Sequence, residues 1–361
     1  MNNRCPQCCL KVLCIAQAKS MTKLTVPANS IQELAAYLLD PNIETEHEVN
    51  IIDRLHEIYS ELAIVSGYDG EEGWKHDMQT SSGMAISVNE AARCLLDYRR
   101  TGQFLRGLHA AILEAKKLHP GESIKVLYAG CGPYAPFLTL VAPQFSPGEV
   151  VFSLIEINGE SLDIAQHLVE AFELQAYLLE THLADATLFQ VPNAKDYHIL
   201  FTETMDTALE REPMVPILLN LLPQLRSDVL LLPRNVTVEG VFFSHAELPD
   251  GIDILWELTT NIPGHSIGTV MDMSEALGTY LELEEPDGIF HELQCELPAL
   301  AFRDFFALYT TVEIWDGIFL YKNESDITDL RVRNLTDLPP CDYINFEYLL
   351  GEDLELMFGV S

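Results

Sequence analysis

The sequence predicts an α/β protein in three parts: a helical N-terminal region, a doubly wound α/β domain and a C-terminal antiparallel β domain with a barrel-like form. Three different patterns along the chain support this prediction. Apolar residues return every three or four positions over residues 31–117. Short apolar runs alternate with helical stretches over residues 124–233, and alternating β-branched and aromatic residues follow. The predicted fold class is therefore mixed α/β.

The first 20 residues are predicted to form a flexible, Cys-rich leader. Four cysteines gather there: Cys5, Cys8, Cys9 and Cys14. The CPQCC spacing also allows a zinc or copper site, because Cys-x-x-Cys is a metal-ligand spacing, but no His or second Cys pair follows at a zinc-finger distance. The pattern favours a leader without metal, and the metal alternative stays open.

Residues 21–120 form the predicted helical region. The segments IQELAAYLLD and IIDRLHEIYSELAIV, and the long stretch that begins NEAARCLLDYRR, each repeat apolar residues at helical spacing. The turn-rich GYDGEEG at residues 67–73 divides them into two helical groups. Pro120 and Gly121 close this region.

The remaining chain is divided near residue 234. In residues 121–234 the runs IKVLYAG, VVFSLIEIN, AYLLETHL and YHILFTE alternate with helical segments, which predicts a parallel sheet covered on both faces. In residues 235–361 alternating segments such as VTVEGVFF and FFALYTTVEIW predict antiparallel strands. We expect this β domain to serve substrate binding or dimerisation.

The charge balance restricts the partners. The chain has 55 acidic and 21 basic residues, for a net charge of -34. Such a charge repels nucleic acid and anionic membranes and favours cationic partners. No apolar run reaches the roughly 18 residues that a membrane span needs, and the N-terminus lacks the pattern of a signal peptide. We expect a cytoplasmic protein with no nucleic-acid or membrane partner.

A glycine turn and two acids follow consecutive predicted strands. In VLYAGCGPYA, a buried strand runs into Gly130-x-Gly132, where glycine lets a ligand approach the backbone and the next helix offers free N–H groups. Glu156 ends the next apolar run, at a position suited to ribose hydroxyls, and Asp185 follows a third, where it could meet an adenine edge. Acids after successive parallel strands share one edge of the sheet, so the pattern favours a nucleoside-bearing ligand.

The segments VLYAGCG, IEIN, LADAT and FTE, in that order, resemble the motifs of class I S-adenosylmethionine-dependent methyltransferases, whose nucleotide-binding domain is Rossmann-like. LDYRRTGQF at residues 96–104 is similar to the D-x-x-R-T-x-x-Y helix of the protein arginine methyltransferases. TETMDTALEREPM at residues 202–214 is similar to their double-E loop. The resemblance covers about residues 94–241.

Four features depart from that family's pattern. Tyr128 stands where the strand before the glycine turn usually ends in an acid, and the third glycine of the turn is missing. No threonine-histidine-tryptophan loop is found in the β domain. The family's aromatic helix is not recognisable, although residues 76–84 are candidates for part of a lid over the cofactor.

The resemblance implies S-adenosyl-L-methionine as cofactor. Arg100 stands where the family grips the cofactor's carboxylate, a task that suits a guanidinium fork. The expected cofactor-binding residues are Arg100, Tyr128, Gly130, Cys131, Gly132, Glu156, Ile157, Asp185, Ala186 and Glu203. The resemblance also implies a homodimer.

The double-E loop contains three candidate catalytic acids, and their spacing discriminates between two pairings. On one continuous helix, Glu203 and Glu210 would share a face. Glu203, however, ends a buried strand, and Pro213 suits the first turn of the next helix, which places Glu212 at that helix start. We therefore expect Glu203 and Glu212 to be catalytic and keep Glu210 in reserve.

Two carboxylates can hold an amine or guanidine by charge-assisted hydrogen bonds while the nitrogen attacks a methyl group. The predicted function is N-methylation of a cationic guanidino or amine group on a small molecule, peptide or protein. One alternative is an NAD-dependent oxidoreductase, because Gly130-x-Gly132-x-x-Ala135 also fits the dinucleotide fingerprint. The other is a non-catalytic binding protein of the methyltransferase fold, which the departures at Tyr128 and the third glycine favour.

Overall fold

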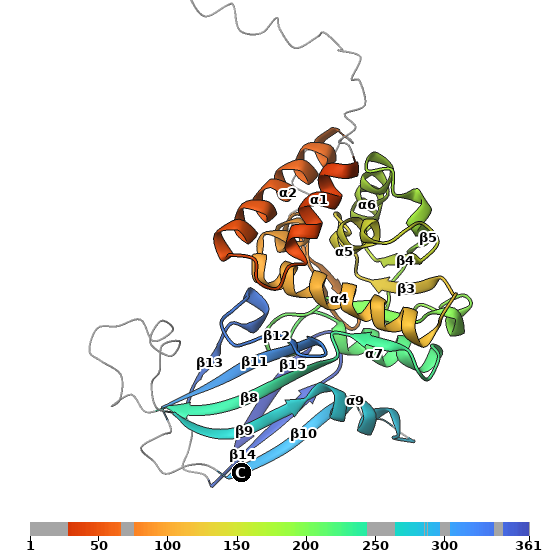
Figure 1. The fold of residues 1–361 in the computed structure, drawn as a ribbon. Coiled ribbons are helices and arrows are strands. Elements are labelled where there is room, and N and C mark those ends of the chain that lie inside the picture. Colours follow the sequence, from red (N-terminus) through yellow and green to blue (C-terminus); the bar gives the residue numbers. More distant parts are fainter. Residues whose placement is uncertain are drawn as a thin grey trace, which may run out of the picture.

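The computed structural model describes residues 28–65, 76–243, 264–284, 286, 288–296, 304–335 and 342–360. The predicted leader and the predicted break at residues 67–73 lie outside these ranges. Figure 1 shows the arrangement: N-terminal helices pack on the α/β domain, and the antiparallel strands lie beside it. Within the described ranges, no helix combines the length and the apolar character that a membrane crossing requires. The structure confirms the predicted fold class.

One buried arginine joins the first helices to the α/β domain. Helices α1 (Ala28–Leu38) and α2 (Thr45–Val65) lie against α4 (Tyr98–Leu118). Arg106 of α4 donates from Nη2 to Glu48 Oε1 of α2 at 2.8 Å and from Nη1 to the Leu38 carbonyl oxygen at 2.7 Å. Glu48 is only 1% exposed. The guanidinium therefore also satisfies a carbonyl at the end of α1, which has no partner within that helix.

Between α2 and α4 the chain forms a small hairpin and two short helices. These elements are β1 (Met78–Thr80), β2 (Gly83–Ala85), α3 (Val88–Arg93) and the 3₁₀ helix η2 (Cys94–Leu96). Asp97 then caps α4, because its Oδ1 accepts the Arg100 N–H at 3.1 Å. Its Oδ2 accepts from the Ser325 hydroxyl at 2.6 Å and the Asp326 N–H at 3.0 Å. The same carboxylate therefore starts α4 and fastens it to the β domain.

The central sheet is parallel, with the strand order β5-β4-β3-β6-β7. Its strands are β3 (Ile124–Ala129), β4 (Val150–Glu156), β5 (Leu178–Leu183), β6 (Ile199–Thr202) and β7 (Leu230–Leu232). Helices α5 (Pro136–Val141), α6 (Gly159–Ala171) and α7 (Met214–Leu221) connect them. The chain runs outward from β3 to β5 and then returns to the other side of β3. The switch point between β3 and β6 is where such sheets bind ligands, at the carboxyl ends of the strands.

The β domain consists of two antiparallel sheets. One has the order β12-β11-β8-β9, with β13 also paired to β11, and the other has the order β10-β14-β15. The strands are β8 (Asn235–Phe243), β9 (His265–Asp272), β10 (Ile289–Glu296), β11 (Phe305–Trp315), β12 (Ile318–Leu320), β13 (Arg331–Asn334), β14 (Tyr343–Leu349) and β15 (Glu355–Val360). Helix α9 (Met273–Leu281) follows β9. Phe306 and Phe346 pack between the sheets with ring centroids 5.2 Å apart.

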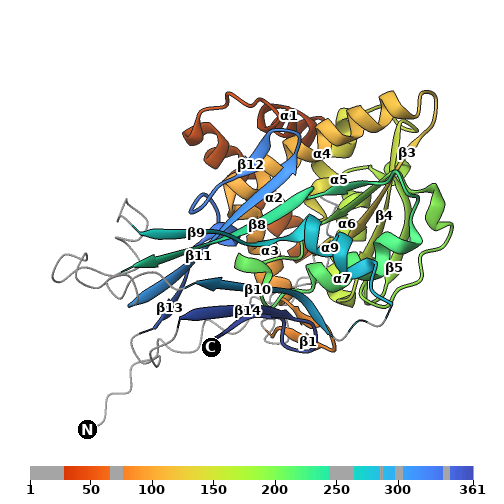
Figure 2. The same cartoon turned by 90° about the horizontal axis from the view of Figure 1, so that it is seen from below.

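The β domain and the parallel sheet meet along α4. Figure 2 places the antiparallel strands on one side of the molecule and the parallel strands on the other. Gly107 permits the close approach of α4 to β11, because a Cβ there would lie 2.3 Å from Ile314 Cγ2. This contact fixes where the β domain stands relative to the switch point.

We predict that Glu48→Ala lowers the free energy of unfolding by about 3–5 kcal/mol, because it leaves the Arg106 guanidinium buried without its counter-charge. Glu57→Ala in the same helix removes an exposed pair with Arg54 and should cost less than about 1 kcal/mol. Thermal unfolding of the two variants measures the difference. Equal midpoints would show that the Glu48–Arg106 pair does not hold the helices together.

Candidate functional site

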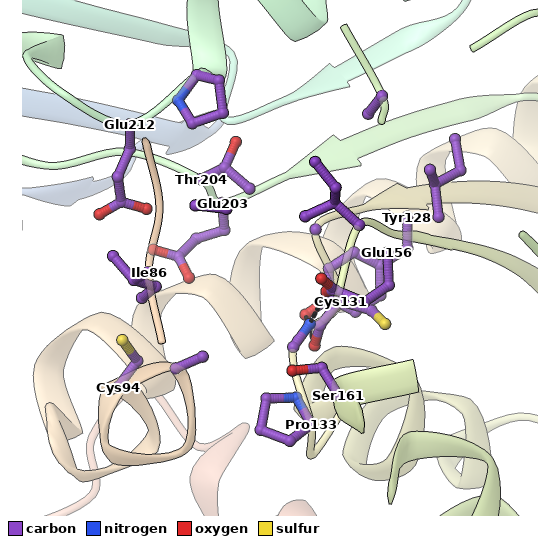
Figure 3. Close-up of a pocket in the computed structure, with 18 of the residues that line it drawn as sticks. Ile86, Cys94, Tyr128, Cys131, Pro133, Glu156, Ser161, Glu203, Thr204 and Glu212 are labelled. Atoms are coloured by element: carbon purple, nitrogen blue, oxygen red, sulfur yellow. Dashed lines mark hydrogen bonds between the residues drawn. The ribbon is translucent and has the colours of Figure 1, made fainter. Parts of the chain in front are cut away.

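A cavity lies at the carboxyl edge of the parallel sheet, at the switch point (Figure 3). Its empty space is about 1050 Å³, including the part open to solvent. The turn after β3, the ends of β4 and β6, the loop after β5, and the β2–η2 segment all contribute to its wall. The predicted residues that line it are Arg100, Tyr128, Gly130, Cys131, Gly132, Glu156, Ile157, Asp185, Ala186, Glu203 and Glu212.

Both glycines of the turn have left-handed backbones, with φ of 71° at Gly130 and 62° at Gly132. At Gly130 a side chain is also excluded by space, since a Cβ would lie 2.1 Å from Thr204 Cγ2. At Gly132 the nearest atom would be Ala91 Cβ at 3.8 Å. Gly130 therefore lets the loop after β6 cross the turn, while Gly132 leaves the space above it open.

Glu156 braces the turn that it faces. Its Oε2 accepts the Gly132 N–H at 2.8 Å and its Oε1 accepts the Asn158 N–H at 2.9 Å. Burial raises the pKa of this carboxyl, and these hydrogen bonds oppose the shift. Each oxygen has a second lone pair, so the side chain keeps acceptor capacity for a ligand. The expected contact with ribose hydroxyls stays a prediction, and the support of the turn is a role that the sequence did not suggest.

Tyr128 and Asp185 also form hydrogen bonds that stabilise the backbone of the loops next to them. The Tyr128 hydroxyl donates to the Cys131 carbonyl at 3.2 Å, so the residue that replaces the usual acid closes the turn from its buried side. Asp185 Oδ1 accepts from the Thr187 N–H at 2.9 Å and from its hydroxyl at 2.7 Å. These contacts shape the loop after β5, where Ala186 faces the cavity.

Arg100 and Glu203 form an ion pair inside the cavity. Arg100 comes from the first turn of α4 and is 6% exposed, and Glu203 follows the last residue of β6. Burial raises the pKa of Glu203, and the charge of Arg100 opposes that shift. Arg100 Nε has no hydrogen-bond acceptor among the described residues. The guanidinium therefore contacts the predicted catalytic acid through Nη2, whereas its Nε–H has no acceptor among the described residues.

The loop at residues 203–213 is held in a strained conformation by the β domain. Three of its residues adopt left-handed φ values near 60° although none is glycine: Ala208, Leu209 and Arg211. Thr310 Oγ1 of β11 accepts the Ala208 N–H at 2.9 Å, and the Tyr348 hydroxyl of β14 donates to the Leu209 carbonyl. The loop conformation therefore depends on contacts from outside it.

Two acids of this loop face arginines of β13. Asp206 Oδ2 lies 3.1 Å from Arg331 Nη2. Glu210 Oε1 lies 3.0 Å from Arg333 Nη2, and its Oε2 lies 3.5 Å from Arg331 Nε. Glu210 is 5% exposed and is not among the residues that line the cavity. The structure therefore places the reserve acid Glu210 at the domain contact rather than beside Glu203.

Glu212 also lines the cavity, and its carboxylate forms no ion pair with any of the described residues. No Lys, Arg or His in the described ranges lies within 4.0 Å of its carboxylate. Burial raises the pKa of Glu212 to about 8; Arg100 opposes the shift and Glu203 adds to it. Helix α7 begins at Met214 with Pro213 as its N-cap, one residue later than the sequence predicts.

Several residues of the cavity were not predicted individually as site residues. They are Thr80, Met84, Ala85, Ile86, Cys94, Ser161 and Thr204. Thr80 and Met84 belong to the suggested lid at residues 76–84, and Met84 N–H donates to the Arg211 carbonyl at 2.7 Å. Thr204 occupies the variable position between Glu203 and Met205, where a motif search does not look. Burial raises the pKa of Cys94 to about 11, so its thiol stays neutral.

A second polar cluster lies at the opposite edge of the sheet, where His119, Glu122 and His198 have the spacing of metal ligands. His198 Nδ1 accepts the Lys125 N–H at 3.0 Å, so the ring hydrogen of the neutral side chain lies on Nε2. That nitrogen is 3.3 Å from Glu122 Oε2 and can donate to it. In this tautomer Nε2 carries the hydrogen and donates it to Glu122, so this nitrogen has no free lone pair with which to bind a metal ion.

Comparisons with known proteins give similarity to solved structures and no match by sequence. No family model matches the sequence, and no curated protein matches it. Among solved structures, the chain is similar to the crystal structure of Arabidopsis thaliana protein arginine methyltransferase 10, with a TM-score of 0.43 and 14% identity over 68% of this chain and 84% of that chain.

We predict that Gly130→Ala destabilises the protein more than Gly132→Ala. Both substitutions strain a left-handed residue, at about 1–2 kcal/mol. Only the Gly130 variant also displaces Thr204, which should add about 1–3 kcal/mol. Gly121→Ala, at a left-handed glycine with nothing within 4 Å, controls for strain alone. Thermal unfolding ranks the three variants, and equal losses would argue against the close approach.

We predict that Glu212→Gln raises the thermal midpoint at pH 9 and leaves it unchanged at pH 5. When folding raises the pKa of a carboxyl, the folded protein loses stability as the pH rises from the pKa of the unfolded state to that of the folded state. For Glu212 the pKa of the folded state is about 8. The gain at pH 9 should be about 6 °C. Glu352→Gln, at an exposed acid, is the control and should follow the parent protein at both pH values. A Glu212 variant that does the same would contradict the prediction.

Proposed function

We propose that the protein is an S-adenosylmethionine-dependent methyltransferase that methylates a nitrogen of a cationic guanidino or amine group on a small molecule, peptide or protein. The observation that carries the proposal is the convergence in one switch-point cavity of a glycine turn, Glu156 and a buried Arg100 with an unsatisfied Nε. This combination suits a nucleoside that carries a carboxylate.

The donor set fits this cofactor at two points. Arg100 Nε is buried and lacks an acceptor among the described residues, and a carboxylate would supply one. Glu156 retains one lone pair on each oxygen after accepting from Gly132 and Asn158, and ribose hydroxyls are suitable donors. Asp185, on the loop after β5, lines the same cavity and would contact the base in this proposal.

When bound, the cofactor would supply a methyl group activated by a sulfonium. The protein's own residues position the acceptor and exclude water from it. Met84, Ala85 and Ile86 form an apolar wall over the cavity, and Glu203 and Glu212 stand at the end away from the glycine turn. A nitrogen held there by a carboxylate would be directed at the reacting carbon.

The finer expectations stay predictions. They are the cationic nature of the acceptor, the homodimer and the cytoplasmic location. The high negative charge supports a cationic acceptor, because it favours encounter with positive partners. The oxidoreductase and the non-catalytic binding protein are the alternatives that the following measurement separates from a methyltransferase.

We predict that S-adenosylmethionine and S-adenosylhomocysteine bind the purified protein in calorimetry, and that NAD does not. Arg100→Lys keeps the charge but loses the fork, so both dissociation constants should rise by about tenfold to a hundredfold. Arg99→Lys changes the neighbouring, partly exposed arginine and should leave both constants unchanged. Binding of NAD without either sulfur nucleoside would favour the oxidoreductase. Binding of both nucleosides with no methylated product would favour the non-catalytic alternative.

A further inference from the structure

The acceptor end of the cavity offers one carboxylate whose charge is not already paired. In the loop at residues 203–213, Glu203 faces Arg100, and Asp206 and Glu210 face arginines of β13. Glu212 lines the cavity, and the described part of the chain places no cation within ion-pair distance of it. The tertiary structure therefore does not offer two unpaired carboxylates that could bind a cationic substrate from both sides.

We propose that the methyl acceptor is an alkyl amine, bound as its ammonium ion by Glu212 alone, and that Glu212 also removes the proton that frees the nitrogen to react. This inference rests on the proposed methyltransferase function and narrows its substrate class. An ammonium is a compact charge that one carboxylate can hold, whereas a guanidinium spreads its charge over a planar fork. A guanidinium reaching Glu203 would meet the guanidinium of Arg100 at short range, and like charges repel.

The surroundings of Glu212 support an ammonium on an apolar stem. Figure 3 shows the carboxylates of Glu203 and Glu212 on the side of the cavity where Ile86 and Cys94 lie. Ile86 belongs to an apolar part of the wall that also includes Met84, Ala85 and Pro213. The neutral Cys94 thiol, which donates to the Glu90 carbonyl at 3.3 Å, adds no charge. A hydrocarbon chain can pack on this wall while its terminal nitrogen reaches Glu212.

The proton and electron balance of the step is complete with this one base. The bound ammonium gives a proton to the Glu212 carboxylate, and the nitrogen regains its lone pair. That lone pair forms the bond to the methyl carbon as the carbon–sulfur bond breaks, and the electron pair of the broken bond stays on sulfur. The products are the N-methyl ammonium and a neutral thioether, and Glu212 returns its proton to water.

Several charged groups set the pH range in which Glu212 can act as a base. Arg100 and Arg211 favour its ionised form, while Asp206 and Glu203 disfavour it. A base is most effective when its pKa lies near the working pH, and a carboxyl at its ordinary value would be a weak base for an amine. The rate should therefore rise with pH through the neutral range and level off above the pKa of Glu212.

Two probes with the same hydrocarbon chain test the inference: pentylamine and pentylguanidine, each with S-adenosylmethionine, with formation of S-adenosylhomocysteine as readout. We predict that kcat/KM is about tenfold higher for pentylamine. Glu212→Gln should lower the pentylamine rate by about a hundredfold and abolish its rise with pH. Glu352→Gln is the matched control and should leave both the rate and its pH dependence unchanged.

Binding of S-adenosylhomocysteine to the parent protein and to each variant distinguishes a wrong amine assignment from a wrong cofactor assignment. If the parent protein binds it but prefers pentylguanidine, turns over neither probe, or keeps its rate in the Glu212 variant, the amine assignment is wrong and the cofactor assignment stands. If the parent protein does not bind it, the proposed function itself fails. Retained nucleoside affinity in the Glu212 variant shows that a lost rate is not caused by unfolding.

Discussion

The candidate site depends on one constraint, the conformation of the loop that follows β6. Ala208, Leu209 and Arg211 have left-handed backbones that non-glycine residues rarely adopt. Such residues persist where surrounding contacts outweigh their cost. Those contacts come from the hydroxyls of Thr310 and Tyr348, on two different sheets of the β domain. The β domain therefore determines where the loop's carboxylates point, even though the cavity lies at the edge of another sheet.

The same loop shows how a strongly acidic protein uses its few arginines. With 21 basic residues against 55 acidic ones, one-to-one pairing would leave most carboxylates without a cation. Around this loop, however, Arg331 and Arg333 face Asp206 and Glu210, and Arg100 faces Glu203. Pairing stabilises a buried carboxylate, and an unpaired one is costly. The unpaired Glu212 is thus a local loss of stability at the place where a reactive group is useful.

Hydrogen bonds also hold the glycine turn and the β1–β2 hairpin, which lies in the segment predicted as part of a lid. Glu156 holds the Gly132 N–H from the end of β4, so the turn and the expected ribose-binding acid move together. Met84 of the β1–β2 hairpin donates to the Arg211 carbonyl, and Arg211 N–H donates to the Leu354 carbonyl of the β domain. Backbone hydrogen bonds therefore connect the hairpin, the loop after β6 and the β domain.

Much of this protein was determined by local sequence alone. Apolar periodicity places the helices and parallel strands, because burial of one face or both follows from residue spacing. The glycine turn and the acids at strand ends place the ligand edge, because parallel strands end together. Only the tertiary structure decided which carboxylate stays unpaired: Arg100 and Arg333 lie more than 100 residues from their partners Glu203 and Glu210, and no local spacing encodes such a contact. It also decided that Glu210 leaves the cavity and that Glu212 remains in it.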